Sequence, residues 1–128
     1  MARKKNSLPF DKSGGVIVTQ RRLLESEHYL SLSVYARCLL TQLHLHWRNE
    51  KPVAYGTREA AQKLGCDRRT AMKAFNELER KQFIQMYDAA EFNSQRGSKA
   101  RTWILTWLPF SNRKPTNDWE VSKKTTST

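Results

Sequence analysis

The sequence has 128 residues, 38% hydrophobic and 27% charged, which fits one water-soluble domain with short tails. Lys and Arg number 23 against 12 Asp and Glu, and the resulting formal charge of +11 favours a polyanion such as nucleic acid as the partner. No apolar run approaches the roughly 18 residues of a membrane span, and no apolar stretch follows the basic N-terminus as in a secretion signal. We therefore expect a cytoplasmic protein with no membrane partner.

The N-terminal residues 1–15 are polar and basic, and they are interrupted by proline and glycine. We expect them to form a basic flexible arm with little structure of its own. The cations of this arm either add contacts to DNA phosphates or stay solvated, and solvation is the more common outcome for such arms. They are Arg3, Lys4 and Lys5.

The clearest helix of the chain is predicted over residues 33–47. Ser33 is a good N-cap, because its hydroxyl can accept a hydrogen bond from a free amide of the first turn. Apolar residues at helical spacing then define one stripe that faces the core: Ala36, Leu39, Leu40, Leu43 and Trp47. His44 falls largely off this stripe. Before this helix, residues 16–18 are either a short strand or an extended lead-in, and residues 20–30 predict a short helix.

A short strand and two helices joined by a tight turn are predicted next. Residues 53–55 alternate briefly and indicate the strand. Thr57 is expected to cap a helix over 58–64, which Gly65 ends because glycine adopts the left-handed conformation at least cost. Asp67 is expected to cap a helix over 68–82. The buried face of that helix is formed by Ala71, Ala74, Phe75 and Leu78.

Two strands joined by a polar loop close the predicted domain, which spans 16–110. The strands lie at 83–87 and 101–108, and the second is rich in aromatic and β-branched residues. Alternation within the second strand places three side chains on one face over the core: Trp103, Leu105 and Trp107. Pro109 ends this strand, and residues 111–128 are expected to form a polar flexible tail apart from a contact by Trp119.

Small residues recur at the positions where the two helices of a helix-turn-helix come close. Ala61 lies where the first helix passes the second, Gly65 lies in the turn, and Ala71 and Ala74 are at buried positions of the second helix. The landmarks around them are LSLSVYARCLLTQL, REAAQKLGCDRRTAMKAFNELERKQFI and TWILTWLP. With these landmarks, residues 33–108 resemble the short winged helix-turn-helix proteins of phages, plasmids and integrating mobile elements.

This resemblance implies an α+β, mainly helical fold, in which a three-helix core carries a small antiparallel β-sheet and a wing. The sequence departs from the commonest form of the family at one point. Gln82 stands where a glycine usually ends the recognition helix. We therefore expect a less sharply turned exit from this helix to the wing strand.

The resemblance also implies that residues 67–82 form a recognition helix for the major groove of DNA, which accepts one α-helix. Base contacts are expected from Arg69, Lys73 and Asn76, since arginine can pair with guanine and asparagine with adenine. Contacts to the DNA backbone are expected from Thr57, Arg58, Arg68, Thr70 and Arg80. The loop between the strands would be the wing and would present Gln95, Arg96, Lys99 and Arg101. A merely flexible loop is about equally consistent with its sequence.

Metal and catalytic sites are not expected. Cys38 and Cys66 have no zinc-ligand spacing, and we expect them to be reduced, packed thiols. His44 and His46 are two residues apart on one helix, so they point to different sides. The sequence has no glycine-rich phosphate loop, and nothing in it places a nucleophile beside a base. We therefore expect no cofactor and no enzymatic activity.

The function that follows is site-specific binding of double-stranded DNA by a transcription regulator of a mobile element. One alternative is a replication-initiation or helicase-loading accessory protein, which would hold a replication or transcription protein through the tail around Trp119. A second alternative is an RNA-binding or protein-interaction module on the same scaffold. The oligomeric state is left open: such proteins often bind inverted half-sites as homodimers, but no heptad repeat marks a dimer helix here.

Overall fold

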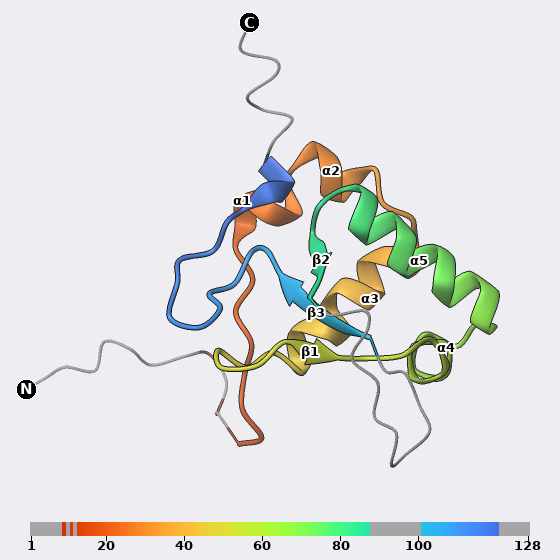
Figure 1. Cartoon of the computed structure of the whole chain (residues 1–128), viewed down its shortest axis with the longest axis horizontal. Helices are drawn as coiled ribbons and strands as arrows, with labels where there is room; N and C mark the ends of the chain where they lie inside the picture. The colour runs from red at the N-terminus through yellow and green to blue at the C-terminus, as the bar shows by residue number, and fades with distance from the viewer. Residues whose placement is uncertain (1–8, 10, 12, 88–100, 121–128) are drawn as a thin grey trace, which may run out of the picture.

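The computed structural model describes residues 9, 11, 13–87 and 101–120 of the chain. Its elements are, in order, α1 (Arg21–Leu24), α2 (Glu27–Leu30), α3 (Val34–Leu45), β1 (Val53–Ala54), α4 (Thr57–Leu64), α5 (Arg68–Arg80), β2 (Ile84–Met86), β3 (Thr102–Leu105) and the 3-10 helix η1 (Asp118–Glu120). The helices α3, α4 and α5 pack on one another, and the sheet lies beside them (Figure 1). This is the arrangement of a winged helix-turn-helix, so the expected fold class is confirmed.

The segment before α3 forms two short helices where the sequence predicted one. Ser26 explains the interruption, because its Oγ donates to the carbonyl of Leu23 (2.7 Å) and accepts from the amide of Tyr29 (3.2 Å). The same side chain therefore closes α1 and caps α2. Residues 16–18 form no strand and are exposed, as an extended lead-in would be.

Helix α3 begins as its sequence predicts but ends at Leu45, before the predicted end at Trp47. The Ser33 Oγ accepts from the amide of Ala36 at 3.2 Å, which is the expected N-cap. The expected stripe is buried from Ala36 to Leu43. His44, placed off the stripe by its spacing, is buried as well, and its Nδ1 lies 3.5 Å from Nε1 of Trp107. Burial lowers the pKa of His44 from its ordinary value. Cys38 was expected to be packed and is instead exposed, on the opposite face of α3.

The turn between α4 and α5 follows from two local signals. Gly65 ends α4 in the left-handed conformation (φ 70°, ψ 39°), as predicted. The Oδ1 of Asp67 accepts from the amide of Thr70 at 2.8 Å and caps α5, also as predicted. The expected cap at Thr57 is wrong: Thr57 is the first helical residue, and Gly56 is the N-cap with extended backbone and no side chain to accept a bond.

The exit of α5 is sharply turned, contrary to expectation, and the helix ends at Arg80 rather than at Gln82. Gln82 adopts the left-handed conformation with φ 68°, which glycine adopts most readily. The amide of Phe83 then donates to the carbonyl of Leu78 (2.9 Å), and the amide of Gln82 donates to the carbonyl of Glu79 (3.0 Å). Both bonds belong to a Schellman motif, and the buried side chains of Leu78 and Phe83 provide its hydrophobic contact.

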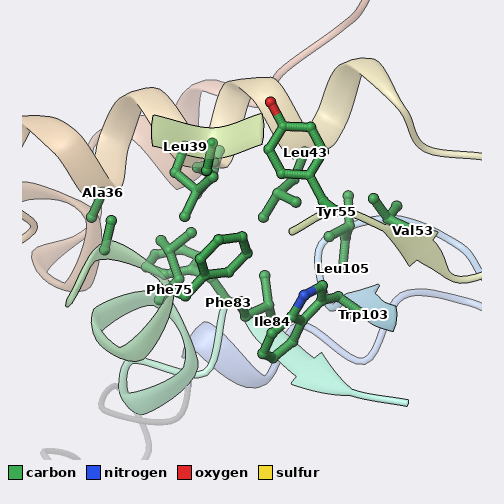
Figure 2. Packing of buried hydrophobic residues seen from close by; sticks show 14 of the residues in the cluster. Ala36, Leu39, Leu43, Val53, Tyr55, Phe75, Phe83, Ile84, Trp103 and Leu105 are labelled. Atoms are coloured by element: carbon green, nitrogen blue, oxygen red, sulfur yellow. The ribbon is translucent and has the colours of Figure 1, made fainter. Parts of the chain in front are cut away.

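The sheet has the order β1-β3-β2, and both pairs are antiparallel. Pairing of Val53 with Trp103 and of Ile84 with Leu105 sets its register. Trp103 and Leu105 are buried on the inner face of β3, as predicted. Trp107 is buried too, but β3 ends at Leu105 rather than at the predicted residue 108, so Trp107 lies in the turn that follows the strand. Phe75 of α5 stacks on Trp103 with 5.5 Å between ring centroids, and Figure 2 shows the α3 side chains directed at this same cluster.

The C-terminal boundary of the domain lies beyond the expected residue 110. Trp119, for which a contact was expected within an otherwise flexible tail, is only 2% exposed and stacks on Phe83. The amide of Asn117 donates to the carbonyl of Thr106 (2.8 Å), and the guanidinium of Arg22 lies 5.6 Å from the Trp119 ring centroid. Residues 111–120 are therefore part of the folded domain, while 121–128 lie outside the described residues.

Candidate nucleic-acid interface

The orientation of α5 is fixed by the four side chains that it buries: Ala71, Ala74, Phe75 and Leu78. Successive residues of a helix are rotated by about 100°, so the face opposite this group is defined. Four exposed side chains lie on it, at positions i, i+4, i+7 and i+11, and we call them the α5 stripe: Arg69, Lys73, Asn76 and Arg80. With a rise of about 1.5 Å per residue, the stripe is about 16 Å long.

The α5 stripe contains every residue that the sequence predicted for base contacts. It also contains Arg80, which the sequence had placed among the backbone contacts. Of the other two contacts predicted from α5, Arg68 is exposed on one flank of the stripe and Thr70 is half-buried on the other. Exposed Met72 lies beside Arg68 and adds an apolar side chain to that flank.

The cations of the α5 stripe are available for a ligand. In the part of the chain that the structure describes, the ion pairs are Arg21–Glu25 and Arg22–Glu120, and neither involves α5. The carboxylate of Glu77 is directed away from the stripe, because it accepts from the amide and the hydroxyl of Ser33 at 2.7 and 2.9 Å. Positive charge therefore dominates the outer face of α5.

Sequence reasoning missed this role of Glu77. Its contact ties the middle of α5 to the start of α3, and so it adds to the buried face in holding the direction in which the stripe points. Glu77 and Ser33 are 44 residues apart, so no local pattern signals their pairing.

Asp67 brings a negative charge to the start of the stripe, but its carboxylate is occupied by the helix. The pKa of Asp67 lies below its usual value, because the backbone amide and the hydroxyl of Thr70 donate to the carboxylate. The charges of Arg69 and Lys73 lower this pKa further. The Asp67 carboxylate thus stays ionised and serves as the cap of α5.

The start of α4 contributes a second group of predicted contacts. Arg58 is exposed and Thr57 half-buried in its first turn. Because the N-cap is Gly56, no side chain accepts from the free amides of this turn. Free amides at a helix N-terminus favour anions such as phosphate, which is consistent with the predicted backbone contacts.

Most of the predicted wing and the three cations predicted to contact DNA from the basic arm lie outside the described residues. This applies to Gln95, Arg96 and Lys99 and to Arg3, Lys4 and Lys5. Arg101, the last predicted wing residue, is described and exposed just before β3, and its carbonyl accepts from the amide of Tyr55 at 3.4 Å. At the end of β2, Tyr87 packs on Phe110 with 5.6 Å between ring centroids.

Two further properties of the described residues bear on function. Their His, Cys, Asp and Glu side chains form no group of three that could hold a metal ion. Across the same residues, no helix has both the length and the apolar character needed to cross a membrane.

Comparisons with known proteins give one structural likeness. No family model and no curated protein matches the sequence. Among solved structures, the chain is similar to MepR, a transcription regulator of the Staphylococcus aureus multidrug efflux pump MepA. The TM-score is 0.47 and the sequence identity 18%, over 84% of this chain and 62% of the MepR chain. The chain thus matches less than two thirds of the length of that protein.

Proposed function

We propose that this chain is a site-specific double-stranded DNA-binding protein that regulates transcription. The observation that carries the proposal is the α5 stripe, a row of three cations and one amide directly opposite the buried face of the second helix of a helix-turn-helix. The major groove of DNA is about 12 Å wide and admits one α-helix. A helix with a stripe about 16 Å long can place several side chains against base edges there.

The side chains of the stripe divide into two roles. Arg69 can donate two hydrogen bonds to guanine, Asn76 can exchange two with adenine, and Lys73 can donate to guanine. Each well-formed bidentate pair discriminates against a wrong base by about 1–3 kcal/mol. Arg80, at the far end of the stripe, is assigned to phosphate, because a helix that enters a groove obliquely brings its N-terminal residues closest to the bases.

Phosphate contacts supply the remaining affinity. On α5 they come from Arg68 and Thr70, and on α4 from Thr57 and Arg58, whose first turn offers free amides. The wing and the basic arm would add further cations. These contacts fix the position of the protein on the duplex and leave sequence discrimination to the stripe.

The regulatory role rests on the proposed binding to a DNA site. A protein that only binds a DNA site acts by occupying it, so we propose that this chain occupies a promoter. The sequence resemblance to winged-helix proteins of phages, plasmids and integrating elements supports a promoter of a mobile element.

Capture of sheared genomic DNA from the source organism by the purified protein, followed by sequencing, tests this function. Strong enrichment of one or a few promoters is the expected result. Enrichment over clustered repeats near an origin would replace promoter regulation with replication initiation. Absence of any enrichment at moderate salt, with the protein shown to be folded, would contradict the assignment of α5 as a recognition helix.

A further inference from the structure

The outer face of α3 is unusual for a helix on the surface of a basic protein. Opposite its buried stripe it exposes Val34 (69%), Leu45 (55%) and Tyr35 (43%), with Cys38 and Thr41 exposed between them. No described element covers these side chains. A surface helix normally presents charged and polar residues to water, and one that is apolar on nearly all sides is normally buried. We call these five residues the outer face of α3.

The outer face of α3 carries no charge. Apart from the histidine at position 44, the one ionisable cation of this helix is Arg37, on the flank of the outer face. Its guanidinium donates to the carbonyl of Leu30 at 2.8 Å and lies 5.3 Å from the ring centroid of Tyr29. Arg37 is thereby held against α2, away from the outer face. Two chains of charge +11 repel each other in most orientations, so an uncharged face is where copies can meet with least repulsion.

The spacing of four of these five residues is self-complementary, while Tyr35 lies to one side of them. Val34, Cys38, Thr41 and Leu45 are separated by four, three and four residues, which reads the same in both directions. If two copies pack antiparallel about a two-fold axis, Val34 lies opposite Leu45 of the second copy, and Cys38 lies opposite its Thr41. Large side chains then meet large ones at both ends and small ones meet at the centre, as close packing of two helices requires.

We propose that the outer face of α3 is a dimer interface on which a second copy of this chain docks in antiparallel orientation. This inference does not depend on DNA binding. Because α5 packs on the buried side of α3, the α5 stripe of each copy stays exposed in such a dimer. A helix of 12 residues is about 18 Å long, so the interface is small compared with the roughly 800 Å² per partner of a standard one. We therefore expect a weak dimer with a dissociation constant in the micromolar range.

Sedimentation equilibrium of the full chain tests the interface. The wild type is expected to change from monomer to dimer as its concentration rises from about 1 to 200 µM, across the range expected for a small interface. Leu45→Glu places a carboxylate against the apolar Val34 of the partner copy and is expected to weaken association at least tenfold. Met72→Glu makes the same kind of change at an exposed apolar residue of α5 and serves as the matched control. A wild type that stays monomeric throughout, or equal effects of the two variants, would overturn the proposal.

Oxidative cross-linking tests the antiparallel register. In a background of Cys38→Ser and Cys66→Ser, Val34→Cys and Leu45→Cys are introduced singly and together. Within one helix these positions are about 16 Å apart, too far for a disulfide, which needs Cα atoms within about 7 Å. Covalent dimer is expected from the double variant and from an equimolar mixture of the two single variants, but from neither single variant alone. Cross-linking of each single variant by itself would show a parallel pair, and no cross-linking in any sample would exclude this contact.

Discussion

The indole of Trp119 stacks on the ring of Phe83, with 6.0 Å between the ring centroids and an interplanar angle of 11°. The amide of Phe83 also donates to the carbonyl of Leu78, and this hydrogen bond ends α5. The C-terminal segment therefore packs against the exit of the proposed recognition helix. Because its side chain is engaged in this contact, Trp119 could hold the partner protein of the replication alternative only by leaving it.

Replacement of this indole tests whether the C-terminal segment belongs to the fold. Trp119→Ala is expected to lower the free energy of unfolding by about 3–5 kcal/mol, because a large buried aromatic side chain is removed and a cavity remains. Urea denaturation followed by circular dichroism measures the change. Tyr87→Ala, at a largely exposed aromatic residue, is the control and should have a much smaller effect. Equal stability of Trp119→Ala and the wild type would show that residues 111–120 are a tail after all.

Replacement of the left-handed residue at the exit of α5 is expected to raise the free energy of unfolding rather than to lower it. Gln82→Gly is expected to stabilise the protein by about 0.5–1 kcal/mol, since glycine adopts a positive φ without the steric penalty of a side chain. Lys81→Gly is the control one residue earlier, where φ is negative (−86°) and glycine should destabilise. Thermal melts of the three proteins compare them. A lower melting temperature for Gln82→Gly would contradict the positive φ at this position.

The cap of α5 predicts a dependence of stability on pH. Because the folded state lowers the pKa of Asp67 below its ordinary 3.8, the stabilisation is present above that pH and is lost as the pH falls through the lower, folded pKa. Asp67→Ala should lower the melting temperature at neutral pH, whereas Asp67→Ser should retain the cap but not its titration. Melts between about pH 2 and 7 distinguish the three proteins. An identical acid dependence in Asp67→Ser and the wild type would show that Asp67 is not responsible.

The parts of the fold that the sequence predicts are those set by neighbouring residues. Ser33 and Asp67 cap their helices, and Gly65 ends α4, because each acts on amides or backbone angles within a few positions. The buried face of α5 follows from helical spacing in the same way. Since that face also fixes the opposite one, helical spacing alone is enough to group Arg69 and Lys73 with Asn76 on the outer side of α5.

The parts that the sequence does not predict depend on distant residues. Trp119 is buried because Phe83 lies where the C-terminal segment returns; a contact by Trp119 was expected, but its polar neighbours did not indicate that the segment around it is folded. Gln82 adopts a strained conformation because the Leu78–Phe83 contact and the bond from the Thr106 hydroxyl to its carbonyl (2.9 Å) hold it there. Exposure of Cys38 differs from these cases, because helical spacing already places it opposite the stripe that contains Ala36 and Leu39; the expectation of a packed thiol failed because no described element covers that face.

The affinity of a charge-reversal variant for duplex DNA tests the central claim most directly. The measurement compares Arg69→Glu/Lys73→Glu with a control of equal charge change, Arg21→Glu/Lys114→Glu, whose residues are exposed and lie outside α4 and α5. Fluorescence anisotropy with a captured genomic site, at several salt concentrations, gives the dissociation constants. The α5 variant should bind at least about 100-fold more weakly, since two contacts of about 1–3 kcal/mol each become repulsive, while the control should lose only a few-fold through its changed net charge. Equal losses in the two variants, or unchanged affinity in the α5 variant with its fold intact, would show that the α5 stripe does not bind DNA.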